Sequence, residues 1–188
     1  LRKRNPEDSI SVRKNEKGEP LTLTLLTSPS PVHNRRIAEM VASQWQKLGV
    51  SVTVQIPATM TDFQDKLLRR DYDILLFGES LLDNLDAFPC WHSSGIQKLS
   101  GNSANLRGDA FNLSQYASFE ADSLLESFRK TTSEKDRTEQ LKNLENIIKR
   151  DVPAVFLYSP TYIFAHRDSI LGVELGSLSL HSDRFLTL

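Results

Sequence analysis

The residues best suited to chemistry lie close together, between positions 83 and 94. Two carboxylates, Asp83 and Asp86, precede an aromatic and polar cluster made of Phe88, Trp91, His92, Ser93 and Ser94. An exposed carboxylate at the end of a strand can pair with a ligand ammonium group through a charge-assisted hydrogen bond. Aromatic rings can supply apolar or cation–π walls. We therefore expect ligand binding here, with loop anchoring by Phe88 and Trp91 as an equal alternative.

The cluster also contains the residue types of a hydrolase, in Asp86, His92 and Ser93. Closeness in sequence says little about such a triad, because a triad is defined by geometry. No G-x-S-x-G turn accompanies these residues. We therefore expect a protein that is not an enzyme, and we keep a small α/β hydrolase as an alternative. A second alternative is a non-catalytic interaction domain with an exposed apolar patch around Trp91.

Neither a metal nor a cofactor is expected. Cys90 and His92 have a ligand-like spacing, but two ligands are too few for a zinc site. The phosphate-binding and dinucleotide-binding glycine motifs are missing from the sequence.

Composition points to a globular protein. The 188 residues carry a formal net charge of −1, with 39% hydrophobic and 25% charged residues. So balanced a charge gives no electrostatic footprint for nucleic acid or for an anionic membrane. No apolar run approaches the roughly 20 residues that a membrane span needs.

The elements that must position the cluster alternate between strand and helix. Apolar periodicity predicts strands at 21–25, 50–56 and 72–77, and helices at 33–48 and from Thr61, which with Gln64 forms a capping-box pattern. Such an order implies parallel strands joined by right-handed crossovers. Residues 78–94 then read as a loop, without helix or strand, that leaves a buried strand at its carboxyl end, where ligands bind in open α/β sheets.

The second half of the chain is predicted to be mainly helical. Ser118 and Ser133 read as helix caps, and Arg150 and Asp151 end the second helix before Pro153. Residues 154–158 and 162–165 look like strands. The long polar stretch at 96–115 has no periodicity, which is often a sign of function, and we include its marker Asn102 and the following Tyr116 among the ligand-binding candidates. We expect residues 1–20 to form a connector and residues 21–188 a single α/β lobe.

Taken in order, these signals resemble the carboxy-terminal lobe of the family 5 extracellular solute-binding proteins, the oligopeptide-, dipeptide- and nickel-type receptors of bacterial ABC importers. The matching stretches are residues 19–25, 37–39, 47–50, 71–78, 86–94, 101–102, 122–125, 150–158, 172–175 and 182–185. Two positions depart from the family pattern: Ala87 replaces the usual proline, and Ser80 stands where peptide binders often have tryptophan.

The resemblance implies one lobe of a periplasmic-binding-protein-like type II fold, with a mixed, mostly parallel sheet flanked by helices. It implies a monomeric receptor that closes on a short peptide or small solute together with an amino-terminal lobe missing from this chain. Such a receptor delivers its cargo to an ABC permease from the periplasm or from a lipid anchor outside the cell membrane. By the family pattern, Asp83 is the carboxylate that pairs with the peptide's amino terminus.

Overall fold

The computed structural model describes residues 11–79, 81, 85–96, 112–160, 165 and 167. The chain divides into two compact units, Leu1–Glu79 and Ser80–Leu188. The expected division into a connector at 1–20 and a single lobe at 21–188 stays a prediction.

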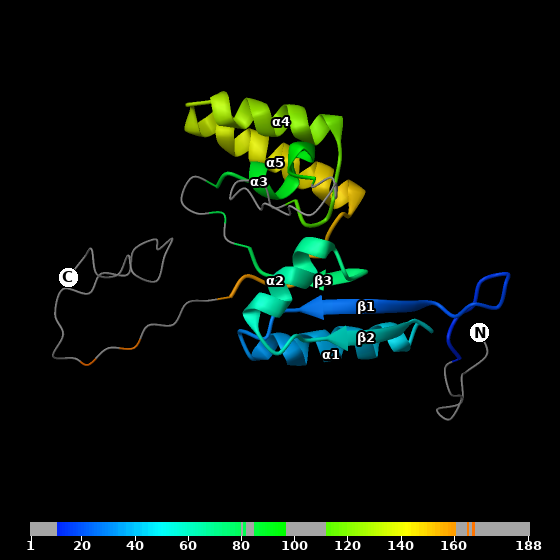
Figure 1. The fold of residues 1–188 in the computed structure, drawn as a ribbon. Coiled ribbons are helices and arrows are strands. Elements are labelled where there is room, and N and C mark those ends of the chain that lie inside the picture. Colours follow the sequence, from blue (N-terminus) through cyan, green and yellow to red (C-terminus); the bar gives the residue numbers. More distant parts are fainter. Residues whose placement is uncertain are drawn as a thin grey trace. The chain divides into compact units, whose positions relative to one another are not determined.

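The first unit is built on three parallel strands, β1 (Thr22–Thr27), β2 (Ser51–Gln55) and β3 (Ile74–Leu76), in the order β2-β1-β3 (Figure 1). In the register, Leu25 of β1 lies opposite Val54 of β2 and Ile74 of β3. The adjacent residues Leu25 and Leu26 are 1% and 0% exposed. Because neighbouring side chains on a strand point to opposite faces, both faces of β1 are covered. The predicted parallel β-α-β-α-β order is confirmed.

Two helices connect these strands, α1 (His33–Gln46) and α2 (Met60–Arg69). Helix α1 matches its prediction and is followed by Gly49, whose φ of +79° suits glycine. For α2 the predicted cap at Thr61 is wrong. Thr59 caps the helix, because its extended backbone lets the hydroxyl oxygen accept from the Asp62 N–H at 3.1 Å, whereas Thr61 already lies within the first turn.

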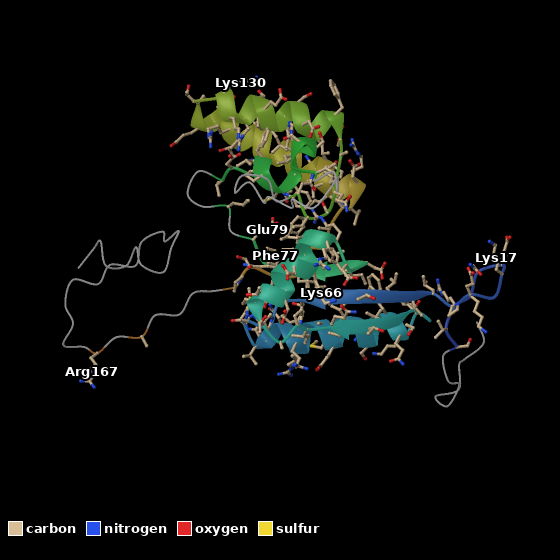
Figure 2. The ribbon with its side chains drawn as sticks, in the orientation of Figure 1. Lys17, Lys66, Phe77, Glu79, Lys130 and Arg167 are labelled. Atoms are coloured by element: carbon tan, nitrogen blue, oxygen red, sulfur yellow. The ribbon has the colours of Figure 1, made fainter. Side chains whose placement is uncertain are left out.

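An aromatic contact joins α2 to the chain just after β3. The ring of Phe77, labelled in Figure 2, stacks against that of Phe63 with centroids 6.1 Å apart and an interplanar angle of 19°. Phe63 is 1% exposed and belongs to the core, while Phe77 is 42% exposed. The contact therefore packs Phe77, the residue just after β3, against the buried side chain of Phe63.

The second unit is helical in its described part, with α3 (Phe88–Trp91), the short 3₁₀ helix η1 (Ser93–Gly95), α4 (Phe119–Lys130) and α5 (Glu134–Asp151). The expected caps Ser118 and Ser133 are confirmed, since each side chain accepts from a backbone N–H of the first turn. Its core consists of Ala87, Ala121, Leu125, Leu144, Ile147 and Ile148. Lys130, labelled in Figure 2, ends α4.

Two expectations for this unit are wrong. The segment predicted to be entirely loop contains α3 and η1; Pro89 sits in the first turn of α3, where its missing N–H costs nothing. Residues 154–158 form no strand. Val155, Phe156, Leu157 and Tyr158 are 50% to 74% exposed, and a strand needs a paired neighbour as well as strand-forming residues. The strand predicted at 162–165 lies outside the described residues apart from Ala165.

Among the described residues, no helix is long and apolar enough to cross a membrane.

Candidate functional site

Asp86, at the entry to α3, is held by an arginine of α4. Arg129 donates from Nε to both carboxylate oxygens, at 3.2 and 3.0 Å, and from Nη2 to Oδ2 at 2.6 Å. The Phe88 N–H also donates to Oδ1, at 3.2 Å. Burial by itself would raise the pKa of Asp86, but the hydrogen bonds from Arg129 and Phe88 outweigh it and hold the pKa below its ordinary value. The Asp86 carboxylate is thus ionised and is already paired with Arg129.

Phe88 is enclosed on both faces of its ring. The Arg129 guanidinium carbon lies 3.7 Å from the ring centroid on one face. The His92 imidazole stacks on the other, with centroids 4.0 Å apart and an interplanar angle of 15°. A ring filled on both sides has little area left for a ligand, so this geometry favours the anchoring interpretation of Phe88.

His92 is 8% exposed, and its two ring nitrogens have different surroundings. Its Nδ1 accepts from the Ser94 N–H at 3.0 Å and lies 2.7 Å from Ser94 Oγ. The other ring nitrogen, Nε2, is buried, lies 3.6 Å from a Glu126 carboxylate oxygen and has no hydrogen-bond partner among the described residues.

The three residues of the hydrolase alternative each have a different partner. Ser93 donates from its hydroxyl to Asp122 Oδ2 at 2.5 Å and from its backbone N–H to Asp122 Oδ1 at 2.9 Å. Asp86 pairs with Arg129, and His92 Nδ1 with Ser94. The serine hydroxyl is therefore bound to a carboxylate of α4 rather than to the imidazole that a nucleophile requires.

Trp91 and Tyr116 lie together in an aromatic group. The ring of Trp91 meets those of Tyr116 and Phe156 edge-on, at centroid distances of 6.2 and 6.1 Å. The Tyr116 hydroxyl donates to Asp151 at the end of α5. Burial, together with this hydrogen bond, raises the pKa of Tyr116 above its ordinary value. The two predicted residues are thus brought together, and Phe156 is a neighbour that the sequence did not suggest.

Asp83 and Asn102 lie outside the described residues. Asn112, which the sequence did not indicate as a ligand-binding candidate, is a further residue of this site. Its Nδ2 donates to the carbonyls of His92 and Tyr116, at 3.1 and 2.7 Å, and its Oδ1 accepts from the Tyr116 N–H at 3.0 Å. At 0% exposure it ties the segment after α3 to the one before α4. The only hint in the sequence is its place in an Asn-x-Ser turn.

A hollow lies in the first unit, at the carboxyl ends of β1 and β2, with a volume of about 470 Å³. Its lining comes from the residues just after these strands and from the start of α1: Ser28, Pro29, Val32, Arg35, Ile56, Pro57 and Ala58. The carboxyl edge of a parallel sheet is where ligands bind in open α/β folds. From the sequence we expect a ligand only beyond β3, although the rule holds for β1 and β2 as well.

The part of the chain that the structure describes holds no group of three or more side chains suited to a metal ion.

Comparison with known proteins gives consistent matches. The chain is 26% identical over 159 residues to the oligopeptide-binding protein AppA of Bacillus subtilis, which covers 84% of this chain and 27% of that protein. It is 27% identical over 156 residues to the probable D,D-dipeptide-binding periplasmic protein DdpA of Escherichia coli, covering 82% and 28%. No protein-family model matches.

Solved structures show the same fold. The AppA structure, in complex with a nonapeptide, superposes with a TM-score of 0.63 at 22% identity, covering 80% of this chain and 27% of that one. Campylobacter jejuni NikZ, in complex with Ni(L-His), gives a TM-score of 0.54 at 20% identity, covering 76% and 28%. The predicted α/β class is thereby confirmed. The chain spans about a quarter of the length of the proteins it matches.

Proposed function

Because the chain is a relative of the family 5 extracellular solute-binding proteins, as its sequence pattern predicts, we propose that it serves as a ligand-binding lobe of an ABC-importer receptor for peptides. The observation that carries this proposal is the similarity to an oligopeptide-binding protein over 84% of the chain. The hollow at the carboxyl edge of the sheet supports it, because that edge is the ligand-binding edge of such folds.

The proposed ligand is a short peptide, or a small solute that carries an ammonium group. We propose that Asp83 receives the peptide's amino terminus. Asp86, the other carboxylate of this stretch, already has a bidentate partner in Arg129. Trp91 and Tyr116 are proposed as ligand walls, together with Asn102, while Phe88 and His92 support them from within the helical unit.

The partners proposed are those of an importer receptor. An amino-terminal lobe of the same protein would close on the ligand from the other side, as pockets favour domain interfaces. We assign the exposed apolar residues at 155–158 to contact with that lobe, since strand-forming residues without a paired strand suit the edge of another sheet. The receptor would act as a monomer outside the cytoplasm and deliver its cargo to a membrane permease.

The comparisons support neither alternative. The relatives are named as binding proteins, and the bond from Ser93 to Asp122 leaves the hydrolase without an activated nucleophile. The interaction-domain alternative predicts exposed apolar surface near Trp91, which the exposed side chain of Phe156 supplies. We attribute that surface to the amino-terminal lobe.

Calorimetric titration of the full-length protein with ligands tests the proposal. We expect a pool of short peptides to bind and a pool of sugars not to bind. Replacing Asp83 by Asn should weaken peptide affinity by about 2–5 kcal/mol, the cost of removing one member of a buried charge pair. Asp65→Asn, which changes an exposed carboxylate of α2, is the matched control and should bind like the parent.

The outcomes separate the two parts of the proposal. Failure of every peptide to bind would refute a peptide receptor. Peptide binding that Asp83→Asn leaves unchanged would refute the role of Asp83 alone.

A further inference from the structure

We propose that three aromatic residues, Trp91, Tyr116 and Phe156, form a latch that couples ligand binding to lobe closure. This aromatic latch joins the segment before α4 to the segment after α5, and the latter is the one assigned above to contact with the amino-terminal lobe. The inference rests on the function proposed above. It adds a route by which a ligand that contacts Trp91 changes the position of residues that meet the other lobe.

The first step concerns the meeting of two segments at one ring. Trp91, the last residue of α3, meets the ring of Tyr116 at a centroid distance of 6.2 Å and an interplanar angle of 81°. It meets the ring of Phe156 at 6.1 Å and 62°. Both contacts have the edge-to-face geometry that aromatic pairs prefer. Because Tyr116 precedes α4 and Phe156 follows α5, Trp91 ties together the two ends of this helix pair.

The second step concerns the fixed side of the latch. The Tyr116 hydroxyl donates to Asp151, the last residue of α5, which also accepts from Arg150 Nε at 2.8 Å. The buried side chain of Asn112 holds the Tyr116 backbone, accepting from its N–H at 3.0 Å and donating to its carbonyl at 2.7 Å. Val152 then turns the chain out of α5 with a φ of +48°. Tyr116 is therefore a positioning residue for the point at which the chain leaves α5.

The third step concerns the loose side of the latch. Phe156 is 70% exposed, and its neighbours Val155, Leu157 and Tyr158 are 50% to 74% exposed. Segments with little buried apolar surface open at a low cost in free energy, and the elements that move in conformational changes are drawn from them. The contact between Phe156 and Trp91 therefore holds an exposed segment against the helical unit, and it can be broken without disturbing the core.

The fourth step is the coupling itself. A ligand shifts a conformational equilibrium only when it binds one state more tightly than the other. A ligand that packs on Trp91 while Phe156 is in place contacts both rings, so it favours the state in which the latch is formed. Coupling is reciprocal, and the formed latch in turn raises the affinity for the ligand. In that state residues 155–158 are held in one position for the amino-terminal lobe.

The test uses the full-length protein and the tightest-binding member of the peptide pool. Calorimetry measures the peptide affinity, and small-angle X-ray scattering measures the decrease in radius of gyration at saturating peptide. Tyr116→Phe keeps the ring and removes only the hydroxyl bond to Asp151, whereas Phe156→Ala removes the loose ring. We expect each variant to lower the affinity roughly tenfold, within the usual range of coupling effects. Each should also show a smaller decrease in radius of gyration than the parent, even when saturated.

Phe119→Ala is the matched control, because Phe119 is 90% exposed at the start of α4 and the change removes the same ring outside the latch. It should bind and close like the parent. The double variant of Tyr116 and Phe156 should be no worse than Phe156→Ala alone, because both changes act on one latch. Since Tyr116→Phe removes a single hydroxyl, it keeps the test decisive even if Phe156→Ala does not fold.

The two readouts separate coupling from direct contact with the ligand. A residue that only touches the ligand lowers the affinity but leaves closure complete at saturation. Complete closure of both variants at saturating peptide, or a parent that binds peptide without closing, would therefore overturn the latch and leave peptide binding standing. Failure of the parent to bind any peptide would refute the proposed function, and the latch with it.

Discussion

The ion pair between Asp86 and Arg129 makes the stability of the protein depend on pH in a predictable direction. The pKa of Asp86 is lower in the folded protein than its ordinary value, because the hydrogen bonds from Arg129 and Phe88 outweigh the effect of burial. A carboxylate with a lowered pKa stabilises the folded state above the pKa of the unfolded chain, about 3.9. This contribution is lost as the pH falls through the folded pKa.

The exposure of the two side chains sets the magnitude. The Asp86 side chain is 20% exposed and that of Arg129 is 44% exposed. A fully buried pair would cost 3–5 kcal/mol to break, and an exposed one about 0.2–1. With bidentate geometry but a partly solvated arginine, we expect Asp86→Asn to lower the free energy of unfolding by about 1 kcal/mol at neutral pH.

Urea denaturation followed by circular dichroism measures this effect. The parent protein and Asp86→Asn should differ by about 1 kcal/mol at neutral pH, and the difference should shrink as the pH falls through the lowered pKa of Asp86. Among the described residues, three other carboxylates have lowered pKa values, Asp71, Glu145 and Asp151, and they are present in both proteins and cancel in the difference. A difference that stayed constant from neutral to acid pH would show that Asp86 contributes no charge-dependent stability and would refute the reasoning.

Two further predictions concern packing and capping, and urea denaturation measures both. Leu125→Ala should cost about 2–5 kcal/mol, because Leu125 is 1% exposed in the helical core, while Leu124→Ala, at a partly buried neighbour, should cost clearly less. Equal losses would contradict the assigned core. Thr59→Ala should cost about 1 kcal/mol by removing the cap of α2, and Thr61→Ala close to nothing. A larger loss in Thr61→Ala than in Thr59→Ala would show that Thr61 is the cap, as the sequence pattern suggested.

The first unit could be predicted from the sequence because each element carries its own pattern. The alternation in β1 and β2, the apolar stripe of α1 and Gly49 after it are local signals, and the structure follows them. The misplaced cap of α2 shows the limit of such signals. Both Thr59 and Thr61 are followed three residues later by a polar side chain, and the backbone conformation at Thr59 decides between them.

The second unit was harder to predict where tertiary contacts override local preference. Helix α3 has only four residues, too few to be stable alone, and it depends on the packing of Ala87 and the enclosure of Phe88. For residues 154–158 the sequence predicts a strand where none forms. Their side chains are typical of strands, but a strand also needs a paired neighbour, about which the local sequence says nothing.

For the candidate site, the sequence identified residue types but not their roles. An exposed carboxylate that binds a ligand and one that anchors a turn look alike in sequence, since both follow a strand within a polar stretch. Arg129 lies 43 residues after Asp86 and carries no motif that links the two. That single contact gives Asp86 an internal partner, whereas the ligand contact of Asp83 remains a proposal. The pH-dependent stability of Asp86→Asn and the peptide affinity of Asp83→Asn therefore test the physical basis on which the two aspartates are assigned different roles.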